Sequence, residues 1–184
     1  METKESEQVV IPLSRTKILM ITAGALVLTA GAVFLWFIAD EQRRISPGFA
    51  RIVSVLGTLL FGAGIIYGAV KLLDKRPGLV LDAGGIIDNS SAIAAGRIPW
   101  EEIVDIQTMS VSGQNFLSII VTDPEKYIAR GNPAKRMLAK ANYKGYGTPI
   151  FISAMSLGMN LAELQDAVFG MYQKHGKSPG GEAV

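Results

Sequence analysis

Two adjacent carboxylates, Glu101 and Glu102, stand beside Trp100 in the stretch GRIPWEEIVDI and are the first candidates for acid–base chemistry. A general acid and a general base must converge on one point from different environments. In a helical turn, adjacent side chains point about 100° apart, so both carboxylates reach water instead of facing each other. The spacing of Trp100 and Ile103 predicts such a turn, with both apolar side chains directed inward. We therefore expect no catalytic residues in this stretch.

The other reactive side chains are few. The chain has one histidine, His175, and no cysteine, which excludes disulfides, thiolate nucleophiles and cysteine metal sites. A metal site needs several ligands, and His175 is better explained as a cation at a helix C-terminus. A Ser-His-Asp triad through His175 is the alternative, but the surrounding QKHGKSPGG is expected to be exposed. Because no glycine-rich phosphate motif occurs either, we expect no enzyme, no metal site and no cofactor.

The stretch RGNPAKRMLAKANYKG is basic and lacks acidic residues. Its basic residues are Arg130, Lys135, Arg136, Lys140 and Lys144. Asn132 before Pro133 predicts a helix start, and a helix over 133–142 places Arg136 and Lys140 one turn apart. Beside an anionic membrane, each basic residue contributes about 1 kcal/mol; the alternative is a solvated helix that contacts nothing. The net charge of +2 is too small to indicate nucleic-acid binding.

Two long segments without charged residues precede this region. Residues 18–39 and 52–70 contain 22 and 19 residues, and the whole chain has a mean hydropathy of +0.31. As helices they are about 33 and 28 Å long, close to the roughly 30 Å hydrocarbon thickness of a bilayer. The alternatives are buried core helices and a cleaved signal peptide. The missing polar face and the missing cleavage pattern favour two transmembrane helices.

The loop between these segments predicts a helical hairpin. Ser46-Pro47-Gly48 suits a tight reversal, which places both long ends of the chain on one side of the membrane. Six basic residues flank the hairpin on that side (Lys4, Arg15, Lys17, Lys71, Lys75, Arg76), and three lie in the loop (Arg43, Arg44, Arg51). The positive-inside rule then predicts that both termini are cytosolic.

The second apolar segment contains a G-x-x-x-G pattern, formed by Gly64 and Gly68. In lipid, glycines at this spacing allow two helix backbones to approach closely. The first apolar segment offers small residues as partners, namely Gly24, Ala25, Ala30 and Gly31. A second copy of the chain is the other candidate partner.

From Pro77 onward the sequence predicts a small antiparallel sheet or partial barrel closed by a C-terminal helix. GLVLDAGGIIDNSS predicts two short strands around a turn, and further strands are expected at 103–111, 116–123 and 147–153. The helix in NLAELQDAVFGMYQKHG is expected to be capped by Asn160 with Glu163, and to stop at Gly176.

The segments GRIPWEEIVDI, GLVLDAGGIIDNSS and PIFISAMSLGMNLAELQDAVFGMY resemble parts of bacterial pleckstrin-homology-like (PH-like) domains. With the hairpin in front, roughly residues 9–173 are similar to a family of uncharacterised bacterial inner-membrane proteins. The resemblance implies a fold and a membrane location, and no catalytic residues. About six strands are predicted where the PH-like barrel has seven. SAIAAGRI either supplies the seventh strand or the barrel is incomplete.

The predicted organisation is therefore a membrane hairpin followed by a PH-like domain. It comprises a cytosolic segment 1–17, a hairpin 18–70, a PH-like domain 77–175 and a disordered tail 176–184. We expect a non-enzymatic integral protein of the bacterial cytoplasmic membrane that presents the cytosolic domain to a protein or to anionic lipid. The alternative is an accessory subunit of a transporter or membrane enzyme complex that docks through its transmembrane helices. A protein partner and a homo-oligomer both remain open.

Overall fold

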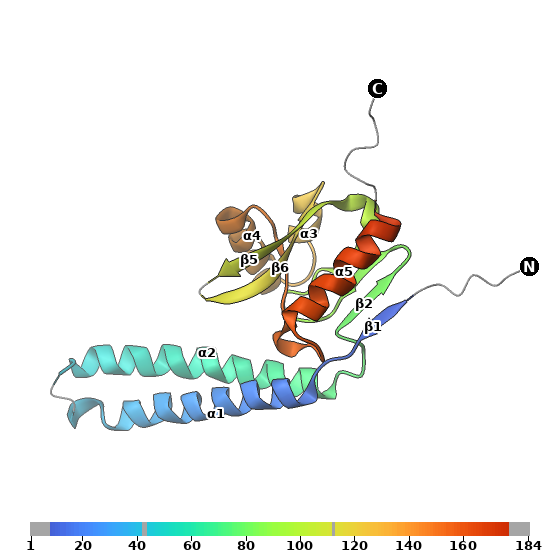
Figure 1. Cartoon of the computed structure of the whole chain (residues 1–184). Coiled ribbons are helices and arrows are strands. Elements are labelled where there is room, and N and C mark those ends of the chain that lie inside the picture. The colour runs from blue at the N-terminus through green and yellow to red at the C-terminus, as the bar shows by residue number, and fades with distance from the viewer. Residues whose placement is uncertain (1–7, 42–43, 112, 177–184) are drawn as a thin grey trace, which may run out of the picture. The chain divides into compact units, whose positions relative to one another are not determined.

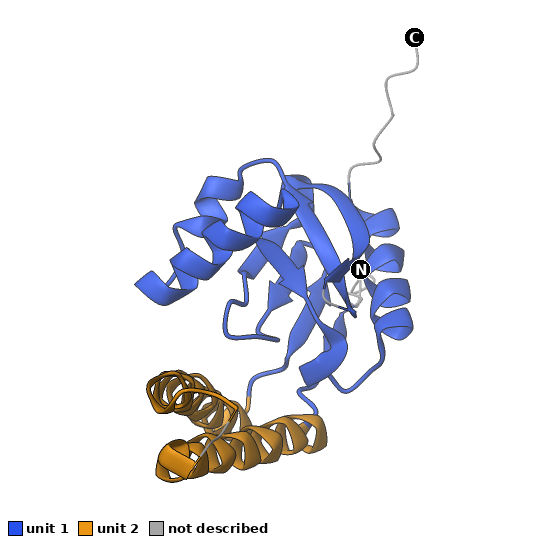
Figure 2. Cartoon of the chain, turned by 90° about the vertical axis from the view of Figure 1, so that its left-hand side faces the viewer, with its two compact units in different colours: residues 1–14, 76–184 blue, residues 15–75 orange. Residues whose placement is uncertain are grey.

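The computed structural model describes residues 8–41, 44–111 and 113–176, which form two compact units (Figure 2). Residues 15–75 form a helical hairpin, and the described residues before and after them group into one unit built on two sheets. The predictions for Lys4, Arg43 and the tail from residue 177 onward lie outside the described residues.

The hairpin unit consists of α1 (Arg15–Phe37), a 3-10 turn η1 (Ala39–Glu41) and α2 (Pro47–Leu73). Proline occupies the first turn of α2, and the Ser46 hydroxyl caps it by accepting a hydrogen bond from the Phe49 amide. Both helices are long and apolar enough to cross a membrane by length and composition. They extend beyond the predicted spans at most of their ends.

The first sheet contains four antiparallel strands in the order β1-β2-β3-β4 (Figure 1). The strands are β1 (Val9–Ile11), β2 (Leu79–Asp82), β3 (Gly85–Asp88) and β4 (Gly96–Pro99). At the β2–β3 turn Gly85 has a φ of 146°, and a Cβ there would collide with the Ile98 carbonyl of β4. Strands β1 and β2 pair with each other, although the hairpin unit lies between them in the sequence.

The second sheet contains three antiparallel strands, β5 (Ile103–Val111), β6 (Gln114–Val121) and β7 (Ile150–Ile152). The 3-10 turn η2 (Trp100–Glu102) joins β4 to β5, as the spacing of Trp100 and Ile103 predicts. Between β6 and β7 lie α3 (Pro124–Ile128) and α4 (Pro133–Tyr146). Asn132 caps α4 as predicted, and the helix continues four residues beyond the predicted end, to the left-handed Gly147 with φ 77°.

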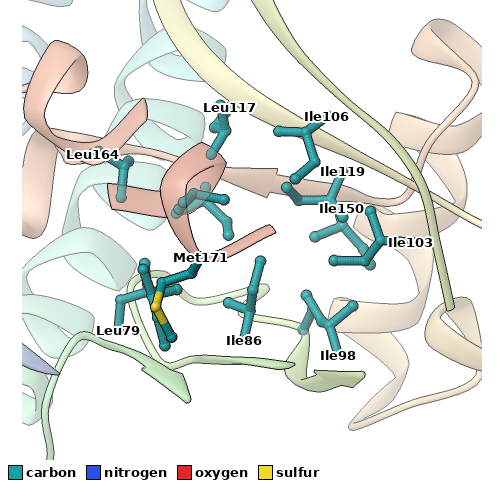
Figure 3. Close-up of a cluster of buried hydrophobic side chains, with 14 of the residues drawn as sticks. Leu79, Ile86, Ile98, Ile103, Ile106, Leu117, Ile119, Ile150, Leu164 and Met171 are labelled. Carbon is teal, nitrogen blue, oxygen red and sulfur yellow. The ribbon is translucent and has the colours of Figure 1, made fainter. Parts of the chain in front are cut away.

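Aliphatic side chains from both sheets meet under α5 (Leu161–His175) to form the core (Figure 3). Leu79, Leu117 and Leu164 are among the side chains with no exposed surface. The indole nitrogen of Trp100 donates to the Asp82 carbonyl at 2.8 Å, which satisfies its one polar atom. The predicted capping box of α5 is confirmed, with Asn160 and Glu163 bonded reciprocally.

The coarse prediction of two long apolar helices, antiparallel sheets and a C-terminal helix is confirmed. The described residues hold seven strands. Residues 96–98 of SAIAAGRI belong to β4, and the strand that the sequence analysis did not identify is β1. It lies in the segment that was assigned to a separate cytosolic N-terminus.

Candidate functional site

The chain leaves for the hairpin from one end of the first sheet, where β1 ends and β2 begins. The registers pair Ile11 with Leu79, Leu79 with Asp88, and Asp88 with Gly96. The end of β1, the start of β2 and both ends of loop 89–95 therefore lie in one row. We call this row the hairpin edge.

Several backbone contacts tie the segment after β7 to the hairpin edge. The Ser14 amide, one residue before α1, donates to the Ser156 carbonyl at 2.8 Å, and the Gly158 amide donates to the Pro12 carbonyl at 2.9 Å. The Ser156 hydroxyl donates to the Ser90 carbonyl at 2.5 Å. Loop 89–95 and the segment 154–158 therefore both lie where the chain enters α1.

Asp88 organises loop 89–95 from its base. Its buried carboxylate accepts hydrogen bonds from the amide and hydroxyl of Ser90, at 2.8 and 2.6 Å, and from the Ala95 amide at 2.8 Å. Burial raises the pKa of the Asp88 carboxyl, and these hydrogen bonds oppose the rise. The carboxylate thus closes the loop by binding both of its ends.

Three of the five basic residues singled out in the sequence bind backbone carbonyls. Arg130 donates to the carbonyls of Ala95 and Arg97, both at 2.8 Å, and Lys135 donates to the Ala94 carbonyl at 2.5 Å. Arg136 donates to Gly131 at 2.9 Å, which closes the turn before α4. Arg130 and Lys135 therefore hold the start of α4 against the loop at the hairpin edge.

Lys140 and Lys144 have a different environment. Both are exposed, and neither has a hydrogen-bond or ion-pair partner in the described part of the chain. They share one stripe of α4 with Met137, at positions i, i+3 and i+7, and Met137 is 66% exposed. We call these three residues the outer stripe of α4.

Exposed apolar side chains gather in the same region. In the described part of the sheet unit, only Val10 and Val104 are large, apolar and exposed outside residues 137–155. The others lie between residues 137 and 155, namely Met137, Leu138, Tyr143, Tyr146 and Met155. No acidic residue occurs between Glu125 and Glu163. The surface around α4 therefore combines positive charge with exposed apolar groups, a composition typical of segments that lie on membranes.

The two carboxylates of η2 do not converge. Glu102 pairs with Lys126 at 2.5 Å and accepts a hydrogen bond from the Tyr127 hydroxyl at 2.7 Å, whereas Glu101 is exposed. These two contacts lower the pKa of the Glu102 carboxyl, while burial and the Glu102 carboxylate raise the pKa of Tyr127. Arg130 stacks over the Tyr127 ring at 4.1 Å. Glu102 thus holds α3 against the sheet.

His175 is the last residue of α5 and is exposed. The described residues contain no group of three or more histidine, aspartate or glutamate side chains arranged to hold a metal ion. The described residues therefore offer no starting point for a metal site.

The glycine pattern of α2 faces α1 of the same chain. A Cβ on Gly68 would collide with the Thr22 side chain, and a Cβ on Gly64 would lie 3.6 Å from the Ala25 methyl group. Gly57 also faces α1, at Ala32, and the Ser54 hydroxyl donates to the Ala32 carbonyl at 2.5 Å. A Cβ on Gly24 or Gly31, in contrast, would meet no atom within 4 Å outside its own stretch of helix. Gly57, Gly64 and Gly68 of α2 therefore serve packing within the hairpin.

Comparisons with protein-family models, with curated proteins and with solved structures found no match to this chain.

Two features of the site escaped the sequence analysis. Carbonyl acceptors such as those of Ala94 and Ala95 leave no mark in a sequence, so the roles of Arg130 and Lys135 were not predicted. Strand β1 has no neighbouring turn that marks it as part of a sheet, since its partner follows the hairpin. The absence of acidic residues between 126 and 162 was a readable signal, and it extends beyond the stretch that was singled out.

Proposed function

We propose that this chain is a non-enzymatic integral membrane protein whose sheet unit is a cytosolic PH-like module that contacts anionic lipid. The observation that carries the proposal is the hairpin edge. The chain leaves for both helices from the edge on which Arg130 and Lys135 dock α4. The basic and apolar surface around α4 therefore belongs to the end of the module that a membrane hairpin would tether.

The surface of the hairpin supports placement in lipid. Its large apolar side chains point outward along both helices: Leu59, Leu60 and Ile66 are at least 65% exposed. In water such a surface would be costly, whereas a bilayer accommodates it. Its backbone polar groups are paired within the helices, as a lipid environment requires.

The arrangement of strands supports the PH-like assignment. The sequence resemblance implied a seven-stranded barrel closed by a C-terminal helix. The chain has a four-stranded and a three-stranded antiparallel sheet with α5 packed on their shared core. Strand β4, which includes residues 96–98 of SAIAAGRI, and strand β1 complete the seven strands. On this assignment, the hairpin replaces the connection between the first two strands of the module.

The length of the connections supports contact with headgroups. Residues 12–14 and 74–78 join the sheet unit to the helices. A three-residue connection reaches roughly 10 Å when extended, and a five-residue one roughly 17 Å. Such tethers keep the hairpin edge near the headgroups, where each lysine of the outer stripe contributes about 1 kcal/mol. The excess of basic residues on the flanks supports a cytosolic location for this side.

The proposal is tested with spin labels on the full chain in nanodiscs. Because the natural sequence has no cysteine, Met137→Cys gives a unique site on the outer stripe and Val104→Cys a control on β5. We expect the label at 137 to enter the apolar interface when phosphatidylglycerol is added to phosphatidylcholine, shown by higher accessibility to oxygen than to a nickel chelate. The label at 104 should stay aqueous.

Charge reversal on α4 provides the matched test. Lys140→Glu with Lys144→Glu should return the label at 137 to water, because about 2 kcal/mol of attraction is lost before any repulsion is counted. Gln173→Glu, which adds negative charge on the exposed face of α5, should leave the label in place. A label at 137 that stays aqueous in every lipid mixture would refute lipid contact by α4.

The second function considered, an accessory subunit that docks through its transmembrane helices, was motivated by Gly64 and Gly68. Both glycines face α1 of the same chain. This placement removes the observation that favoured an external partner at these two positions.

A further inference from the structure

An open pocket of about 220 Å³ lies beside the hairpin edge. The side chains that wall it include Ser91, Ile93, Phe116, Tyr146, Phe151 and Ser153. Phe151 makes edge-to-face contacts with Tyr146 and Phe116, with ring centroids 5.5 and 5.9 Å apart. None of the lining residues is charged. We call this site the aromatic pocket.

Resting on the proposed function, we propose that the aromatic pocket holds one acyl chain of a membrane lipid. The first argument is chemical. Uncharged aromatic and aliphatic walls bind apolar groups by removing them from water. Sites for drug-sized ligands have volumes of about 300–1,000 Å³, so this pocket has room for part of one chain without a headgroup.

The second argument is position. Ser91 and Ile93 belong to loop 89–95, and Ser153 precedes the segment whose Ser156 binds both Ser90 and Ser14. Ser14 is the last residue before α1. The pocket thus lies next to the tether, at the end of the module that would meet the headgroups.

The third argument concerns the surroundings of the pocket. Leu138 lies one helical turn before the lining residue Asn142, and Met155 follows Ser153 by two positions; both are exposed. Lys126 of α3 pairs with Glu102, but the 126–162 stretch contains no acidic residue, and Lys140 and Lys144 of α4 have no acidic partner among the described residues. An anionic lipid matches this combination, whereas a docking protein of acidic character would not account for the exposed apolar rim.

A polar detail fits the start of an acyl chain. The Ser91 hydroxyl is buried and has no hydrogen-bond partner among the described residues. Leaving such a group unpaired costs free energy, and an ester carbonyl accepts hydrogen bonds without needing to donate. A chain bound with its ester near Ser91 would satisfy this hydroxyl.

The test uses Ile93 as an intrinsic probe. The full chain, carrying ¹³C-methyl isoleucine, is placed in phosphatidylglycerol nanodiscs, and NOEs from isoleucine methyl groups to lipid methylene protons are recorded. We expect an NOE at Ile93 that disappears when the acyl chains are deuterated. Ile66, exposed on α2, is the positive control, and the fully buried Ile86 is the negative control.

Variants that fill the pocket test whether the Ile93 NOE arises inside the pocket or on the surrounding surface. Ser153→Phe and, from another element, Asn142→Phe should each abolish the Ile93 NOE while the Ile66 NOE persists. An unchanged Ile86 methyl shift shows that the core is intact, and either variant that meets this condition suffices. An NOE that survives in a folded, filled variant would overturn the proposal, because the contact would then lie outside the pocket.

The Ile93 NOE and the spin label at position 137 test the two proposals separately. If Ile93 shows no lipid NOE while the label at position 137 enters the interface, the acyl-chain proposal fails and the proposed function stands. If the label at 137 also stays aqueous, both fail.

Discussion

The hairpin and the sheet unit use apolar residues in opposite ways. In the sheet unit, large side chains such as Leu81 and Ile98 are completely buried and the exposed positions are mostly polar. In the hairpin, the buried positions include Ala50, Ser54 and Gly68, and leucines lie outward. The sheet unit is therefore held by removal of apolar area from water, and the hairpin by close approach of two backbones.

This difference teaches which substitutions each unit tolerates. A core of interdigitated large side chains is sensitive to the removal of volume. An interface of small residues is instead sensitive to the addition of volume, because there is no space to receive it. Removing side-chain volume should therefore destabilise the sheet unit more than the hairpin, whereas adding volume should destabilise the close contact between the two helices.

The largest effect is expected from removing volume. Leu81→Ala in β2 should lower the free energy of unfolding of the sheet unit by about 3 kcal/mol, because its side chain is completely buried. The matched change Leu59→Ala, at a position that is 65% exposed on α2, should have little effect. Urea unfolding in nanodiscs, followed by hydrogen exchange of each unit, measures both changes. Equal losses at the two positions would abolish the contrast.

A smaller effect is expected from adding volume to the hairpin. Gly68→Ala should weaken α1–α2 association by about 2 kcal/mol, because the added methyl group collides with Thr22. Gly62→Ala is the matched control, since a Cβ there meets no atom within 4 Å. Steric trapping of the two helices in lipid gives the association free energy. A Gly62→Ala variant as weak as Gly68→Ala would show that the loss does not come from the collision with Thr22, because alanine favours a helix more than glycine does.

The smallest effect concerns an ion pair on the sheet unit, and it sharpens the contrast by showing how little charge contributes. Arg97 donates two hydrogen bonds of 2.8 and 2.9 Å to Asp82, which lower the pKa of the Asp82 carboxyl from its usual value. A lowered folded-state pKa adds stability above the unfolded-state value and loses it as the pH falls through the folded-state value. Asp82→Asn should therefore cost about 0.5 kcal/mol at pH 7, and the difference from the natural chain should shrink below pH 4. Urea unfolding at pH 7 and pH 3 checks this, and a pH-independent difference would contradict it.

Local pattern explains most of what the sequence predicted. The two apolar helices, the β2–β3 and β5–β6 hairpins and the capped α5 depend on neighbouring residues, so periodicity and cap residues were sufficient. Strand β1 depends on register with Leu79–Leu81 across the whole hairpin, and three residues carry no period that could show this. A pairing that spans an inserted unit is not visible in a local window.

The composition of the sequence predicted the charged residues of the candidate site, but it did not predict the contacts that they make. The charges of Arg130 and Lys135 were recognised, but their carbonyl partners at Ala95 and Ala94 belong to a loop whose position depends on tertiary structure. Lys140 and Lys144 remain as outward charges because nothing described lies across from them. The aromatic pocket draws Ile93, Phe116, Tyr146 and Phe151 from four separate segments, so no motif identifies it.

If the hairpin spans a membrane, as proposed, the pairing of β1 with β2 also has a consequence for biogenesis. The ribosome releases β1 before either helix, and its partner strand emerges only after both helices have been made. If the translocon inserted a single helix, the two strands would end on opposite faces of the bilayer and the edge of β2 would stay open, ready to aggregate or to be degraded. Completion of the first sheet would therefore act as a proofreading step, in which only chains with both crossings in place acquire a closed, protease-resistant module.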